Sequence, residues 1–101
     1  MNVLNLNSGN FDETIKGGKV LVDFWAEWCG PCRVLGPVIE EVAKENTGNA
    51  VIAKLDIESE RAIAARFNVM SIPTVILFEN GLEVKRFVGV QPKETYVNAI
   101  S

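Results

Sequence analysis

The sequence contains no histidine and only two cysteines, Cys29 and Cys32, in 101 residues. Without histidine, the chain lacks the side chain that most often transfers protons at neutral pH, so histidine-based catalysis is excluded. A structural zinc site takes four Cys or His ligands, and a chain with two of them could hold zinc only together with a partner chain. We therefore expect no metal and no bound cofactor.

The sequence also lacks an excess of positive charge and any long apolar run. Its 10 lysines and arginines are outnumbered by 13 aspartates and glutamates, with no basic stripe to neutralise phosphates, so we expect no nucleic-acid binding. No run reaches the ~18 to 20 apolar residues that span a bilayer, so we expect no membrane insertion. Residues 1–7 have neither the basic region nor the apolar core of a signal peptide. These absences predict a cytoplasmic protein, in which a disulfide is more often catalytic than structural.

What is present predicts one α/β domain over residues 1–101, since 48% of the residues are hydrophobic and the length is too short for two domains. Asn80-Gly81 between apolar runs predicts a hairpin, and Pro37 within a helical pattern predicts a kink. We expect strands at residues 3–6, 20–25, 50–57, 74–78 and 82–88, and helices from Ser8 to Gly17-Gly18, from the cysteines to Gly48, from Ser59 to Phe67 and from Pro92 to Ile100. The order βαβαβαββα predicts a mixed sheet with helices on both faces.

The most informative segment is Trp28-Cys29-Gly30-Pro31-Cys32. It follows the apolar run of residues 20–25 and precedes an amphipathic run at residues 34–43, so the cysteines lie where a strand gives way to a helix. A Cys-x-x-Cys pair at such a junction is typical of a redox dithiol. A structural disulfide is the alternative, although so short a loop would constrain the unfolded chain by only roughly 2 kcal/mol.

The position of the two cysteines at a helix start suggests a division of labour between them. The partial positive charge and unpaired N–H groups of a helix N-terminus favour a thiolate there. Cys29 comes first, and we expect it to be exposed, whereas Cys32 lies one turn into the helix and is expected to be covered. Cys29 would then attack a substrate disulfide, and Cys32 would resolve the mixed disulfide.

Several separate motifs resemble the thioredoxin family over essentially the whole chain: Phe24 through Cys32, then Ser71-Ile72-Pro73-Thr74, Asn80-Gly81 and Gly89. The resemblance implies the thioredoxin fold, a central mixed five-stranded sheet flanked by four helices. It implies a monomeric protein-disulfide reductase and electron carrier that acts on disulfide-containing target proteins. A thioredoxin reductase would recycle it, either a flavin enzyme that draws on NADPH or one that draws on ferredoxin.

Asp23 is flanked by Val22 and Phe24 in the apolar run, so we expect it to be buried, with a raised pKa that suits a proton acceptor for Cys32. A solvated aspartate at a strand edge is the alternative. The resemblance implies that Asp23 is the family's buried aspartate and that Lys54 moderates its titration, unless Lys54 points to solvent. It also implies that Gly30 and Pro31 set a reducing potential.

The resemblance further implies an apolar substrate-binding surface around the reactive sulfur and a cis bond between Ile72 and Pro73. The expected surface residues are Trp28, Ile72, Pro73, Val88, Gly89 and Val90. For Trp28, ordinary packing is the alternative. The chain departs from the family pattern mildly, at Arg33 after the second cysteine, at Met70 beside Ile72 and in a short last helix, and we expect Met70 to affect partner choice.

Two other functions remain open on the same fold. One is an oxidase or isomerase, against which Gly30-Pro31 and the absence of a histidine between the cysteines argue. The other is a binding module that serves as an assembly subunit without redox chemistry.

Overall fold

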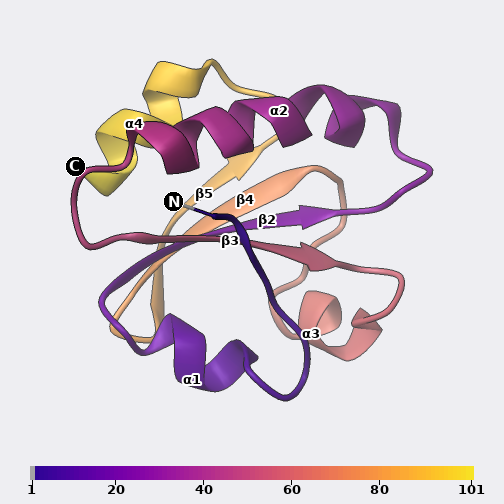
Figure 1. The fold of residues 1–101 in the computed structure, drawn as a ribbon. Coiled ribbons are helices and arrows are strands. Elements are labelled where there is room, and N and C mark those ends of the chain that lie inside the picture. The colour runs from indigo at the N-terminus through magenta and orange to yellow at the C-terminus, as the bar shows by residue number, and fades with distance from the viewer. Residues whose placement is uncertain (1) are drawn as a thin grey trace.

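The computed structural model describes residues 2–101. Its centre is a five-stranded sheet in the order β1-β3-β2-β4-β5 (Figure 1). The strands are β1 (Leu4–Asn5), β2 (Lys19–Trp25), β3 (Val51–Asp56), β4 (Thr74–Glu79) and β5 (Leu82–Val88). β1, β3 and β2 are parallel, whereas β4 is antiparallel to β2 and to β5. The predicted order βαβαβαββα and the mixed sheet are confirmed.

The helices cover both faces of this sheet, as predicted. α2 (Gly30–Glu45) and α4 (Lys93–Ile100) lie on one face, and α1 (Phe11–Ile15) and α3 (Arg61–Arg66) lie on the other (Figure 1). Each face has its own hydrophobic core, because alternate residues of a strand point to opposite sides. In β2, for example, Val22 packs with the core under α1 and α3, and Leu21 packs with the core under α2 and α4. Asp23, two residues after Leu21, therefore faces α2.

Two of the predicted helix starts were wrong. Neither Ser8 nor Ser59 is an N-cap, since α1 is preceded by Asn10 and α3 by Glu60. In the first case the side chain of Asn7 accepts hydrogen bonds from the amides of Gly9 and Asn10, at 2.8 and 3.1 Å, and so stabilises a turn where the helix was expected. Before α3, the Asp56 carboxylate forms a similar turn by accepting from the amide of Glu58 at 2.9 Å.

The hairpin between β4 and β5 has the predicted turn. Asn80 and Gly81 have φ angles of 53° and 89°, as a two-residue type I′ turn requires. The strand pairing then shifts at Leu77/Phe78, which face Lys85 and Glu83 respectively, so that Val84 is an extra residue in β5. This bulge changes which side chains of β5 share a face.

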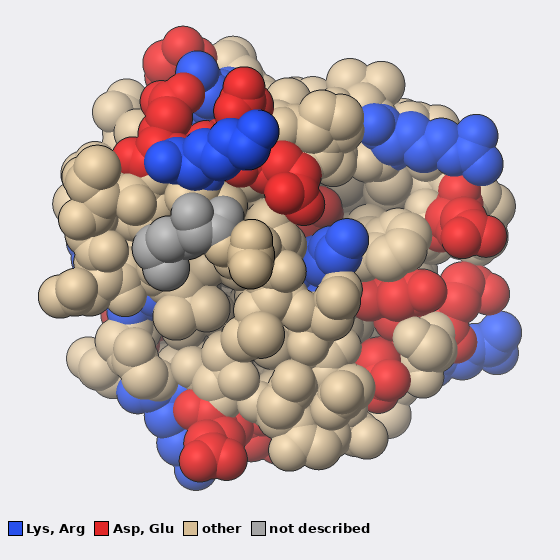
Figure 2. Space-filling view, viewed as in Figure 1, with Lys and Arg blue, Asp and Glu red and all other residues tan. Residues whose placement is uncertain are grey.

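Most of the remaining boundaries shift by a residue or two, and α2 ends at Glu45, three residues before the predicted Gly48. β1 includes only the middle of the predicted range 3–6, and α4 begins one residue after Pro92, which is its N-cap. α2 continues through Pro37. Within residues 2–101, no helix is long and apolar enough to cross a bilayer. On the face that Figure 2 shows, basic and acidic side chains are interspersed rather than gathered into a basic stripe.

Candidate active site

The two cysteines lie at the N-terminus of α2 and are joined by a disulfide, with 5.2 Å between their Cα atoms. Cys29 is the N-cap, with extended backbone, and Gly30 and Pro31 are the first two helical residues. Proline is favourable there because its missing N–H would have no partner in a first turn. The amide of Cys32 donates a hydrogen bond to the Cys29 sulfur at 3.2 Å. One of the unpaired N–H groups of the helix is thus directed at Cys29, where it would stabilise a thiolate.

The predicted difference in exposure between the cysteines was wrong for this disulfide form, since both residues are 5% exposed. Cys29 is covered because its sulfur lies 3.7 Å from the carbonyl oxygen of Ile72 and because the pair packs with Ala26 and Ile57. What differs is the environment of each sulfur. Cys29 faces the loop before β4, whereas Cys32 lines a cavity beneath the helix.

Asp23 is 4% exposed at the centre of the sheet, as predicted, which rules out the solvated alternative. Burial raises the pKa of its carboxyl group to about 7, and the positive charge of Lys54 opposes this shift. Lys54 is the residue of β3 paired with Asp23, and its Nζ lies 5.7 Å from the centre of the Trp25 ring. A carboxyl group with a pKa near neutrality can take up or release a proton under ordinary conditions.

Asp23 and Cys32 line the same cavity, whose volume is about 200 Å³. Lys54, Trp25 and Gly36 are also among its lining residues. Among the described residues, Oδ1 of Asp23 and Nε1 of Trp25 are the buried side-chain atoms without a hydrogen-bond partner. The charged groups of Asp23 and Lys54 line the cavity, which has room for several water molecules that could connect the carboxyl group to Cys32.

The loop before β4 forms the other wall of the site. The peptide bond between Ile72 and Pro73 is cis, as the resemblance implied. Ile72 is half-buried, and Pro73 is buried and accepts a hydrogen bond from the amide of Gly89 at 2.9 Å. This bond joins the segment that carries Val88 and Val90 to the loop that contacts Cys29.

Large apolar side chains are exposed close to this wall. Trp28, which precedes Cys29, is 66% exposed, and Val88 and Val90 are 56% and 40% exposed. Met70, in the same loop as Ile72, is 90% exposed. Exposed apolar side chains grouped in this way are typical of a surface that binds another protein.

Sequence reasoning missed Ile57 and Gly36. Ile57 directly follows β3 and packs against the cysteine pair, and its amide donates to the carbonyl of Trp25 at 2.9 Å. Gly36 leaves open space beside the cavity, because no atom lies within 4 Å of a Cβ placed there. An apolar residue at a strand end and a glycine inside a helix were the available signals. Among residues 2–101 there is no group of three or more side chains that could hold a metal ion.

Comparison with known proteins agrees with this geometry. A family model described as Thioredoxin matches residues 2–101. A protein named thioredoxin from Staphylococcus haemolyticus (strain JCSC1435) is 48% identical over 100 residues, covering 99% of this chain and 96% of the relative. Its counterpart from Staphylococcus aureus (strain N315) is 44% identical over the same length and coverage. The solved structure of a mutant thioredoxin from Halobacterium salinarum NRC-1 matches with a TM-score of 0.88 and 35% identity, covering 98% of this chain and 88% of that one.

Proposed function

We infer that this chain, which belongs to the thioredoxin family, reduces disulfides in target proteins with Cys29 as its nucleophile. The family relationship makes it a dithiol–disulfide oxidoreductase. The observation that supports the role of Cys29 is the amide of Cys32, which lies 3.2 Å from the Cys29 sulfur at the start of α2. Donation from this amide favours the thiolate, which is the attacking form.

In the first step, the Cys29 thiolate attacks one sulfur of a target disulfide. A bond forms between Cys29 and that sulfur, and the second target sulfur leaves as a thiolate. In the second step, Cys32 loses its proton and attacks Cys29. The target is released with both of its sulfurs reduced, and the Cys29–Cys32 disulfide forms. Two electrons have then passed from this chain to the target.

Asp23 is the proposed acceptor of the Cys32 proton. It lines the same cavity as Cys32, and its pKa of about 7 is close to the pH at which the proton must be taken up. Lys54 has the proposed role of limiting how far burial raises that pKa. Gly30 and Pro31 are proposed to tune the redox potential, as the resemblance implies.

The proposed binding surface for the target comprises the exposed apolar residues and the loop before β4. Its members are Trp28, Ile72, Pro73, Val88, Gly89 and Val90. The carbonyl of Ile72 lies 3.7 Å from the Cys29 sulfur, which supports its proposed contact with the backbone of a target segment next to the attacked disulfide. A thioredoxin reductase is the proposed partner that returns the Cys29–Cys32 pair to the dithiol form. We propose that the protein acts as a monomer in the cytoplasm.

Insulin reduction in the presence of dithiothreitol tests this function. Wild type should catalyse the reduction, and Cys29→Ser should abolish it. Cys32→Ser should instead accumulate mixed disulfides on Cys29, because the resolving thiol is gone. Catalysis that persists in Cys29→Ser would refute the proposal. A measured redox potential in the oxidising range would favour the oxidase or isomerase alternative.

A further inference from the structure

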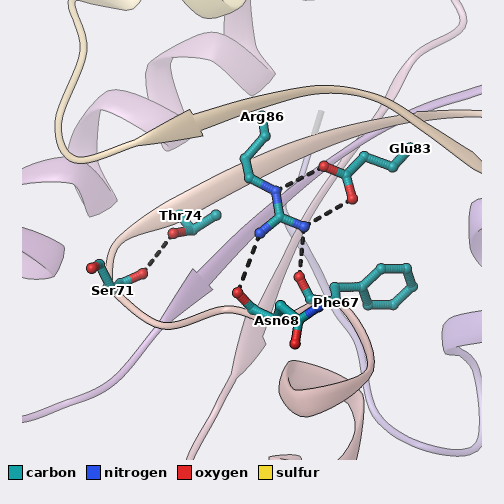
Figure 3. A network of polar contacts seen from close by, with 6 residues as sticks. All are labelled: Phe67, Asn68, Ser71, Thr74, Glu83 and Arg86. Carbon is teal, nitrogen blue, oxygen red and sulfur yellow. Dashed lines mark hydrogen bonds and ion pairs between the residues drawn. The ribbon is translucent and has the colours of Figure 1, made fainter.

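Arg86, on the edge strand β5, contacts a part of the chain that is remote in sequence and leads into the active-site loop. Its guanidinium donates hydrogen bonds to the carbonyl oxygens of Phe67, at 2.6 Å, and Asn68, at 3.4 Å (Figure 3). Glu83 holds the guanidinium with two further hydrogen bonds, at 2.7 and 2.8 Å. The Arg86 and Glu83 side chains are 28% and 32% exposed, so water competes only partly for these bonds.

The bulge in β5 makes this arrangement possible. Residues three apart in a regular strand point to opposite faces, so Glu83 and Arg86 would normally be separated. Because Val84 is an extra residue, Glu83 lies opposite Phe78 and Arg86 opposite Ile76, two residues whose side chains share one core. Both charged side chains therefore face α3, and the Glu83 carboxylate fixes the plane of the guanidinium.

The carbonyls that Arg86 contacts lie just after the end of α3. The amides of Asn68 and Val69 bond back to the carbonyls of Ala65 and Ala64, at 3.1 and 3.0 Å, and Asn68 has a φ of 53°. This is the Schellman arrangement, which satisfies those two carbonyls and reverses the chain direction. The carbonyls of Phe67 and Asn68 are not bonded within this arrangement, and a cation is favourable at the C-terminal end of a helix. Arg86 thus fixes the point at which the chain leaves α3.

The far end of the same segment is also held. The hydroxyl of Thr74 donates to the carbonyl of Ser71 at 2.6 Å (Figure 3), and the amide of Gly89 donates to that of Pro73 at 2.9 Å. Between the two attachments lies Met70, which is 90% exposed. The position of the loop beside Cys29 therefore depends on Arg86 at one end and on Thr74 and Gly89 at the other.

We propose that Arg86 is a positioning residue for disulfide exchange, which holds residues 67–73 so that Met70 and Ile72 meet the target polypeptide beside Cys29. This inference rests on the proposed function, because it assumes that the loop binds the target. It concerns binding and not the exchange chemistry, since Arg86 contacts neither cysteine among its described hydrogen bonds. A small disulfide, which needs no such loop, should react independently of Arg86.

The test is single-turnover stopped-flow fluorescence of the reduced protein with insulin and, separately, with cystine. For Arg86→Gln, the insulin concentration at half-maximal rate should rise about five- to tenfold, the factor expected for one or two lost hydrogen bonds. The limiting rate with insulin and the rate constant with cystine should stay within about twofold of wild type. Arg86→Lys, which keeps one cationic donor, should recover part of the loss.

Lys85→Gln is the matched control, because it removes the same charge from the next residue. The Nζ of Lys85 lies over the Phe87 ring, 5.5 Å from its centre. Lys85→Gln should therefore leave both the insulin and the cystine reaction unchanged. Glu83→Gln keeps the Arg86 donors but holds the guanidinium less firmly, so it should raise the half-maximal insulin concentration about twofold. This variant tests the inference even if Arg86→Gln does not fold. Equal losses with insulin and cystine, or an unchanged insulin dependence in both variants, would overturn the inference. If wild type itself does not reduce insulin, the proposed function fails instead.

Discussion

Asp23→Asn removes a carboxyl group from the centre of β2 while keeping the shape of the side chain. Asp23 is 4% exposed and its Oδ1 accepts no hydrogen bond from the protein, so the charged form is less well solvated in the folded protein than in the unfolded chain. Its pKa is raised by burial from 3.8 to about 7, with Lys54 acting in the opposite direction. We expect the variant to fold and to be more stable than wild type above neutral pH.

The size and sign of this effect follow from proton linkage. Because the pKa is higher in the folded state, the folded protein binds more protons than the unfolded chain between about pH 4 and pH 7. The wild-type free energy of unfolding should therefore fall as the pH rises through this window and level off above it. A shift of about three units at 1.36 kcal/mol per unit gives ~4 kcal/mol as the upper bound of the fall. The asparagine variant has no such group and should lack this fall.

Urea unfolding of the disulfide form, followed by circular dichroism at a series of pH values, measures this difference. The variant should match wild type near about pH 4 and exceed it by a few kcal/mol near about pH 8. Glu40→Gln removes a carboxylate from the exposed face of α2 and serves as the control. Its difference in stability from wild type should not show the pH dependence expected for Asp23→Asn. A stability difference for Asp23→Asn that stays constant from acid to alkaline pH would refute the burial argument.

The same substitution should slow resolution of the mixed disulfide. An amide cannot accept the Cys32 proton, so turnover near pH 7 should fall at least about tenfold, and the loss should shrink at higher pH as Cys32 ionises unaided. Stopped-flow turnover across this pH range measures it. A variant as fast as wild type throughout would exclude Asp23 as the proton acceptor.

Three further outcomes are expected. In the reduced protein, iodoacetamide should label Cys29 well before Cys32, because the Cys29 sulfur accepts a hydrogen bond from the amide of Cys32 at the helix start. Mass spectrometry measures the labelling, and equal labelling of the two cysteines would contradict the assignment. Gly81→Ala should lower the free energy of unfolding by about 1 to 2 kcal/mol, because the φ of Gly81 is 89°. Gly36→Ala should raise the free energy of unfolding by about 0.5 to 1 kcal/mol, because Gly36 lies in a helix with open space around it. Urea titrations that rank the two variants the other way would refute this reasoning. Trp28→Ala, at a side chain 66% exposed, should change stability by less than about 0.5 kcal/mol yet slow insulin reduction, and a large loss of stability would show that Trp28 is a packing residue.

Features that depend on neighbouring residues could be predicted from the sequence. The apolar run of residues 20–25 and the amphipathic run of residues 34–43 placed the cysteines at a helix N-terminus, and Asn80-Gly81 gave the correct hairpin turn. The apolar neighbours of Asp23 indicated its burial. The starts of α1 and α3 were missed although their causes are also local, because the side chains of Asn7 and Asp56 accept from nearby backbone amides and form turns where the helices were expected to begin.

Features that depend on distant segments could not be predicted. The burial of Cys29 arises from the Ile72 loop and from Ile57, which are separated from it by at least one helix and one strand. The cavity shared by Asp23 and Cys32 lies between β2 and α2. Its presence depends on how the helix packs on the sheet, and a local sequence pattern does not specify that packing.

By itself, the sequence determined the order of the elements, the pair of reactive cysteines and the carboxyl group that could serve them, because periodicity, turn chemistry and motif spacing act over a few residues. Only the tertiary structure decided how Arg86 is used. A bulge at Val84 turned it to the same face as Glu83, and the return of the chain after α3 brought the carbonyls of Phe67 and Asn68 within its reach. Such contacts depend on strand register and on how layers pack, and both are set by the whole core at once.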